Sequence, residues 1–237
     1  MTDGAPAGRA SFATTRWSVV VAAAESDPAA ARAALSELCG AYWYPLYADA
    51  RRRGAASADA ADLVQGFFAE LIEKDWVAVA DPDRGRFRAF LLTAFRRHAG
   101  HERERARAAK RGGGAVVSLD MTNAESLFSL EPADTRTPER AFERRYALTL
   151  LARVLGRVRV ERPGDADLLP FVGGPGEARP YAEIAAARGA TEGAVKVAVH
   201  RLRERWRDVL RDEVRATVAD EADVDDEIRC LMDVVAS

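Results

Sequence analysis

Apolar residues recur every three or four positions along most of this chain, which is the spacing that places them on one face of an α-helix. Strict alternation of apolar and polar residues is rare. Two examples are the stripe Leu35, Leu38, Tyr42, Leu46 and Tyr47 and the seam Leu63, Phe67 and Leu71. The pattern predicts an all-α protein, with helices over about 15–24, 28–53, 57–74, 86–110 and 138–160.

Glycine, proline and short polar residues mark the ends of these helices. Gly54 suits a helix C-terminus, and Ser57 is placed to cap the next helix, with Asp59 in its first turn. Residues 111–137 begin with Arg111 and three glycines and then mix Ser, Thr, Asn and Pro without a period, which predicts a linker. Pro138 suits the first turn of the helix that follows.

This segmentation predicts two helical domains joined by a flexible linker. The expected parts are a flexible N-terminus (1–11), a first domain (12–110), the linker (111–137), a second domain (138–216) and an acidic tail (217–237). Glycines and prolines interrupt the second domain, so we expect an irregular insert over 157–179. The tail has apolar residues at helical spacing, so we expect that it folds back on a domain, masks a basic surface or forms a frayed terminal helix, of which the last is the commoner outcome.

Residues 181–196 have the pattern of a helix, a tight turn and a second helix. Ala185 is small where two helices cross, Gly189 suits a left-handed turn and Thr191 suits the cap of the next helix. Apolar residues to fill the joint are Ile184, Val195 and Val199. This spacing is typical of a DNA-binding helix-turn-helix, whose second helix enters the major groove; the plain alternative is a solvated helical hairpin.

The charges are distributed unevenly although the formal net charge is only −2. Residues 84–111 hold ten Lys or Arg against two acids, whereas residues 220–233 are mostly acidic. The basic half-helix from Arg96 to Arg111 lies beside Phe87, Phe90 and Phe95, a combination that suits phosphate binding and the stacking of unpaired bases. An ordinary solvated basic face explains the same run equally well.

Three segments in this order resemble extracytoplasmic-function sigma factors of the sigma-70 family, over about 12–110 and 139–215. Residues 59–68, which alone indicate only an amphipathic helix, are similar to the helix of that family that binds the polymerase. Residues 87–107 are similar to its helix for the −10 promoter element, and residues 191–203 to its helix for the −35 element. Departures from the family pattern are Ala61 and Gly66 for acids, Phe90 for Trp, Arg97 for Asn, and the insert at 157–179, so a divergent subgroup is indicated.

The resemblance implies a non-enzymatic chain that directs core RNA polymerase to particular promoters. The implied polymerase-binding residues, which would contact the clamp helices of the largest subunit, are Asp59, Asp62, Leu63, Gln65 and Phe68. The implied contacts to the −10 region are Arg88, Arg96, Arg97, His101, Arg103, Arg105 and Arg107. Those implied for the −35 region are Thr191, Glu192, Lys196, His200, Arg201, Arg203 and Arg205.

Two other functions stay open. A stand-alone helix-turn-helix regulator would bind DNA without polymerase, and a helical adaptor would bind only proteins. Regulation by an anti-sigma factor, a kinase or the acidic tail is also open.

Several other classes of protein are disfavoured by the residues present. The two cysteines have no paired spacing, so neither a disulfide framework nor a zinc site is expected. His98, His101 and Glu102 share a helical face, but its surrounding arginines disfavour a bound cation, and no phosphate-binding loop or nucleophile elbow occurs. We therefore expect no catalytic residue, metal or cofactor. With no apolar run near 20 residues, the sequence predicts a cytoplasmic protein without membrane contact.

Overall fold

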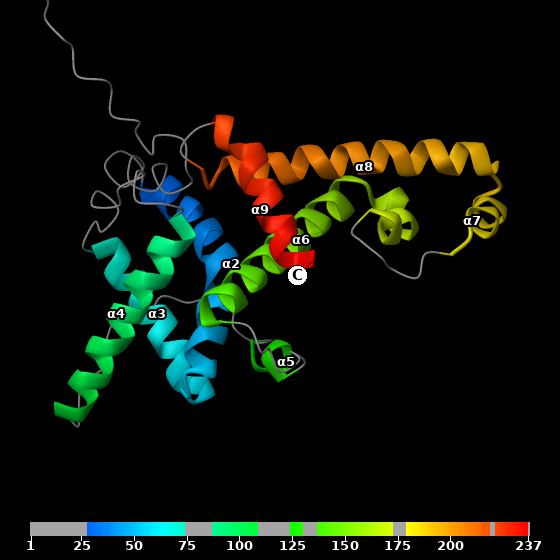
Figure 1. Cartoon of the computed structure of the whole chain (residues 1–237). Helices are drawn as coiled ribbons and strands as arrows, with labels where there is room; N and C mark the ends of the chain where they lie inside the picture. Colours follow the sequence, from blue (N-terminus) through cyan, green and yellow to red (C-terminus); the bar gives the residue numbers. More distant parts are fainter. Residues whose placement is uncertain are drawn as a thin grey trace, which may run out of the picture. The chain divides into compact units, whose positions relative to one another are not determined.

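The computed structural model describes residues 28–73, 87–108, 124–129, 137–172, 179–218 and 221–236. These residues form helices and turns, with no strand among them, which confirms the all-α prediction (Figure 1). The expected helix at 15–24, the N-terminus at 1–11 and most of the expected linker lie outside the described residues. No helix in the described part is both long and apolar enough to cross a membrane.

The α-helices in chain order are α2 (Pro28–Arg52), α3 (Ser57–Glu73), α4 (Phe87–Ala108), α5 (Ala124–Ser129), α6 (Pro138–Glu161), α7 (Tyr181–Arg188), α8 (Glu192–Arg215) and α9 (Val224–Ala236). Two 3-10 helices, η2 (Pro163–Phe171) and η3 (Glu221–Asp223), connect α6 to α7 and α8 to α9.

The residues predicted to begin or end helices do so where the sequence places them, with one exception. Gly54 follows α2 with a φ of +88°, a conformation that glycine adopts without a Cβ clash. Pro138 is the first residue of α6, where a missing N–H costs nothing. Ser57 differs from its predicted role as a cap, because it is already the first residue of α3 and its hydroxyl pairs with that of Tyr47 at 2.8 Å.

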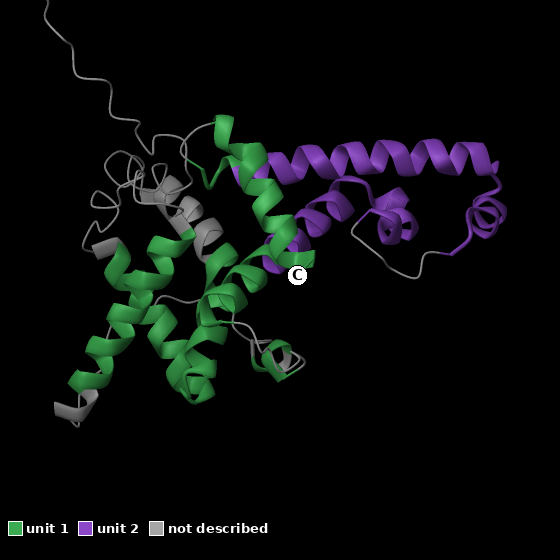
Figure 2. Ribbon diagram, viewed as in Figure 1, with its two compact units in different colours: residues 1–147, 215–237 green, residues 148–214 purple. Residues whose placement is uncertain are grey.

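The chain divides into two compact units (Figure 2). Unit 1 contains residues 1–147 and 215–237, and unit 2 contains residues 148–214. The division therefore falls inside α6 and at the end of α8, whereas the sequence placed the domain boundary in the linker at 111–137. The arrangement of two domains joined by a flexible linker stays a prediction.

Unit 1 is built around aromatic side chains from α2, α3, α4 and the first turns of α6. The rings of Phe67 and Phe95 meet edge to face at 5.3 Å between centroids, and those of Tyr42 and Tyr146 stack at 4.8 Å. All four side chains are buried. Aromatic pairs of this kind contribute about 0.5–1.5 kcal/mol beyond the burial of their area, so they fix how α3 packs on α4 and α2 on α6.

The acidic tail belongs to unit 1 and is an ordered helix from Val224 onward. Val224 and Leu231 are buried, and Glu227 between them is buried as well. The tail therefore folds back on a domain, which was one of the outcomes that the sequence left open.

Unit 2 contains the second part of α6 followed by η2, α7 and most of α8. Its buried residues include Leu150, Val154, Leu168, Ile184, Val199 and Leu202. The buried carboxylate of Glu213 on α8 accepts a hydrogen bond from Arg157 on α6 at 2.8 Å, and Arg153 lies 3.5 Å from it. The charge on Glu213 is thus compensated inside the unit.

The insert expected to be irregular is largely helical where it is described. Residues 157–161 still belong to α6, and residues 163–171 form η2. Leu168 and Leu169 are buried, which gives this short segment an apolar anchor. Pro163 and Gly164 start a 3-10 helix instead of a loop, but its backbone leaves helical angles at Asp165, with φ −111° and ψ 17°. Residues 173–178 lie outside the described part, so the irregular insert as a whole stays a prediction.

Candidate nucleic-acid interface

A helix-turn-helix is formed by α7, residues 189–191 and α8. Gly189 has a φ of +62°, and its N–H donates to the carbonyl of Ala186 at 3.2 Å. The Thr191 hydroxyl accepts a hydrogen bond from the N–H of Ala194 at 3.2 Å, which caps α8. Ile184, Val195 and Val199 are buried at the joint. The left-handed turn, the cap and the buried apolar residues therefore lie where the sequence placed them.

The first turns of α8 present polar and cationic side chains to solvent. Five residues that the sequence assigned to DNA contact are exposed here: Thr191, Glu192, Lys196, His200 and Arg201. Lys196 lies 3.8 Å from Glu192, and His200 lies 3.3 Å from Glu204, so two of the three basic groups have an exposed acidic neighbour. Arg201 forms no ion pair within the described residues.

Two other residues assigned to DNA contact have partners inside unit 2. Arg203 donates to the carbonyl of Phe171 at 3.0 Å, at the end of η2. Arg205 donates to Glu161 on α6 at 2.7 Å, and this hydrogen bond raises the pKa of Arg205 and lowers that of Glu161. Both arginines hold α8 against the segment that precedes the motif.

A third arginine, which the sequence reasoning did not single out, fixes η2 to the motif. Arg188, the last residue of α7, donates to both carboxylate oxygens of Asp167 and contacts Asp165 at 3.3 Å. Its hydrogen bond lowers the pKa of the Asp167 carboxyl. No local signal reveals this pairing, because its partners lie 21 and 23 residues away in the sequence.

The basic helix α4 has an exposed stripe at four-residue intervals, made of Thr93, Arg97, His101 and Arg105. Arg105 pairs with Glu102 at 2.7 Å, and His101 lies 3.9 Å from Glu104. Arg97 and Arg103, which are both exposed, form no ion pair within the part of the chain that the structure describes. Arg107 lies in the last turn of α4, where only the backbone is described.

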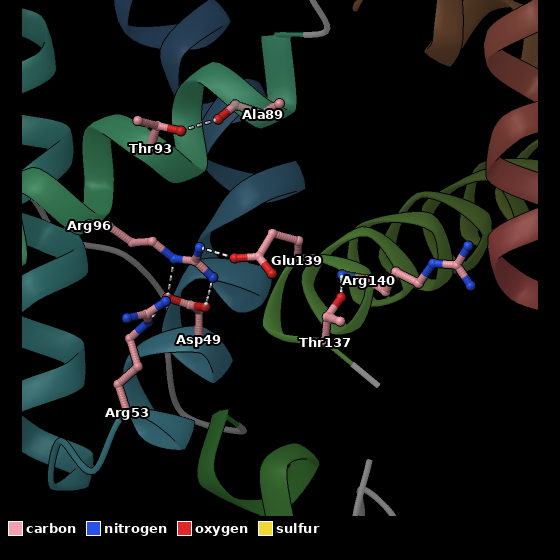
Figure 3. Close-up of polar contacts among 8 residues, drawn as sticks. All are labelled: Asp49, Arg53, Ala89, Thr93, Arg96, Thr137, Glu139 and Arg140. Atoms are coloured by element: carbon pink, nitrogen blue, oxygen red, sulfur yellow. Dashed lines mark hydrogen bonds and ion pairs between the residues drawn. The ribbon is translucent and has the colours of Figure 1, made fainter. Parts of the chain in front are cut away.

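Arg96, also assigned to the −10 region, is held between two carboxylates (Figure 3). It donates to Asp49 of α2 at 2.9 Å and to Glu139 of α6, and Arg53 donates to the same Asp49 at 3.0 Å. Burial disfavours the charge on Arg96, but these hydrogen bonds outweigh it and raise its pKa. Arg96 thus joins α2, α4 and α6, and only about a fifth of its side chain is exposed, at 21%.

Arg88 departs furthest from its predicted role. Its side chain is 2% exposed, and its guanidinium is paired with Glu227 of the tail helix α9. Glu143 lies 3.6 Å away, the Cys230 sulfur accepts a hydrogen bond at 3.4 Å, and the guanidinium lies 5.9 Å from the centroid of the Tyr146 ring. The two carboxylates raise the pKa of Arg88 against the opposing effect of burial. In this structure Arg88 is therefore an interior residue, which corrects its placement on a DNA-binding surface.

The helix assigned to polymerase binding, α3, has one polar and one buried face. Asp59 and Asp62 are exposed, and Leu63 and Gln65 are partly exposed at opposite edges of that polar face. The prediction that Phe68 contacts the polymerase is corrected, because none of its surface is exposed and it packs with Phe67 in the core of unit 1. The sequence could not show whether Phe68 is exposed or buried, since a phenylalanine at the edge of an amphipathic helix fits either face.

No cluster of three or more His, Cys, Asp or Glu suited to a metal ion occurs among the described residues. His98 is buried, and its Nδ1 is paired with Glu70 of α3. No family model, no curated protein and no solved structure matches this chain.

Proposed function

We propose that this chain is an RNA polymerase sigma factor that recruits core polymerase to particular promoters. The observation that carries the proposal is the helix-turn-helix at 181–215, with its left-handed Gly189, its Thr191 cap and the exposed Lys196 and Arg201 at the start of the second helix. A helix presented in this way suits the major groove of DNA.

Two features of unit 1 support a sigma factor in preference to a simple DNA-binding protein. The exposed acids Asp59 and Asp62 on α3 suit a basic surface on a protein partner. The exposed stripe on α4, with Arg97 and His101, suits the phosphates of a second DNA site. A sigma factor needs one polymerase-binding surface and two DNA-binding surfaces, and the two units supply candidates for all three.

In the proposed mechanism, unit 2 reads the upstream element and unit 1 binds both polymerase and the downstream element. Phosphate contacts by exposed arginines supply salt-sensitive affinity, and side chains at the start of α8 supply sequence preference. Neither DNA site alone needs high affinity, because binding to the polymerase holds both units on one promoter.

The stand-alone regulator stays the second candidate, because the helix-turn-helix is the best-formed part of the candidate interface and requires no polymerase. The two functions differ in whether transcription needs this chain together with core polymerase.

The test is run-off transcription with purified protein and bacterial core polymerase on genomic promoter fragments. We expect initiation with the wild-type chain and its loss with the double variant Asp62→Arg/Gln65→Ala. Asp233→Arg, an equal charge reversal at an exposed position of α9, is the matched control and should initiate normally. Direct DNA binding with no core-dependent initiation on any fragment would favour the stand-alone regulator.

A further inference from the structure

The start of α8 has an apolar centre as well as polar edges. Val195, Val199 and Leu202 are buried against the rest of unit 2. Successive residues of a helix are turned by about 100°, so Val197 points almost directly away from Val195 and Val199. Val197 is accordingly 50% exposed, at the middle of the face that the helix-turn-helix presents to solvent.

The residues one turn before Val197 enlarge this apolar centre. Gly193 and Ala194 lie four and three positions earlier, respectively, and both are exposed. A Cβ added at Gly193 would meet only the Thr191 hydroxyl, at 3.8 Å. The side chains at Gly193, Ala194 and Val197 are therefore small and project little from the helix, so another molecule can approach the helix backbone closely there.

The charges around this surface limit what it can contact. Lys196, His200 and Arg201 surround it at the N-terminal part of the helix, whereas Glu204 and Asp208 occupy the same face further along. The two acids would repel phosphates and offset the exposed Arg207 between them, so the part of α8 best suited to DNA ends near Arg201. Val197 lies within that part, with cations on both sides.

In the major groove the thymine methyl group is the apolar group that distinguishes one base pair from another, and apolar side chains recognise it by contact. We propose that Val197, with Ala194 beside it, reads the methyl group of a thymine in the upstream element. This inference rests on the proposed function, because it requires that unit 2 bind promoter DNA through α8.

The test compares thymine with deoxyuridine, which lacks only the methyl group. Duplexes selected by the full-length protein, with core polymerase present, are substituted one thymine at a time, and binding is measured by fluorescence anisotropy. Loss of one buried methyl group corresponds to about a fourfold weaker affinity. We expect this loss at one or two positions for the wild-type protein and its absence for Val197→Ala.

Val160→Ala is the matched control, since Val160 is 81% exposed but lies on α6, and it should keep the wild-type response to deoxyuridine. If no thymine responds in the wild type, or if Val197→Ala responds as the wild type does, the role of Val197 is refuted while promoter binding stands. If the protein with core polymerase binds no duplex at all, both this inference and the proposed function are refuted.

Discussion

The ion pair between Arg88 and Glu227 provides the most demanding test of how unit 1 is held together. The two residues are 139 positions apart, and both side chains are almost fully buried. Glu227→Ala would leave the Arg88 charge inside the protein without its nearest carboxylate. Removing one partner of a buried pair typically costs about 3–5 kcal/mol of stability.

The surroundings of Arg88 narrow this range. Glu143 remains 3.6 Å from the guanidinium and is 31% exposed, so it compensates part of the charge. We therefore expect Glu227→Ala to lower the free energy of unfolding by about 3 kcal/mol, at the low end of the range. Replacing both partners, as in Arg88→Met with Glu227→Leu, should recover most of this loss because no unpaired charge then stays buried.

Urea unfolding followed by circular dichroism measures these changes, with the slope checked so that shifts in midpoint can be read as stability. Asp226→Ala is the control one position away, because Asp226 is 68% exposed and its pair with Arg229 lies on the surface. The free energy of unfolding of Asp226→Ala should stay within about 0.5 kcal/mol of the wild-type value. If Glu227→Ala unfolds at the same urea concentration as Asp226→Ala, the tail does not compensate Arg88 and the reasoning is wrong.

Three further predictions concern single residues. Gly189→Ala should destabilise unit 2 by about 1 kcal/mol because the φ of Gly189 is +62°. Gly156→Ala should instead stabilise unit 2 by about 0.5–1 kcal/mol, because Gly156 lies in the interior of α6 with open space around it. Thermal unfolding compares the two variants, and equal shifts in melting temperature would contradict the left-handed turn. The hydrogen bond with Arg188 lowers the pKa of Asp167 below its value in the unfolded chain. Asp167 therefore stabilises the fold at pH values above its unfolded pKa, and this stabilisation is lost as the pH falls through its folded pKa. Carboxyl NMR titration should show a higher pKa of Asp167 in Arg188→Ala, and an unchanged pKa would disprove the pairing. Burial and the neighbouring Tyr146 raise the pKa of Tyr42 well above its usual value. Absorbance near pH about 10 should therefore show less phenolate in the folded chain than after denaturation. Equal absorbance in the two states would contradict the burial of Tyr42.

The corrections have a common origin in contacts between distant segments. The resemblance assigned Arg88 to DNA, but its partner Glu227 belongs to the tail. Phe68 was assigned to a partner surface because an amphipathic helix does not reveal which neighbours will cover its apolar side. Arg205 was taken as a phosphate contact, although Glu161 lies 44 residues away in the sequence and 2.7 Å away in space. Nothing in the charge pattern distinguishes an arginine that meets DNA from one that meets a carboxylate.

The sequence by itself determined the helical character of the chain and the helix-turn-helix, because these depend on signals within a few residues. Apolar spacing defines a helical face, Gly189 permits a left-handed turn, and Thr191 caps the next helix through a neighbouring N–H. Tertiary structure decided which charges stay exposed and which segments join one unit. Those outcomes depend on burial and on pairing across tens of residues, where the strength of an interaction is set by the surroundings that the whole fold creates.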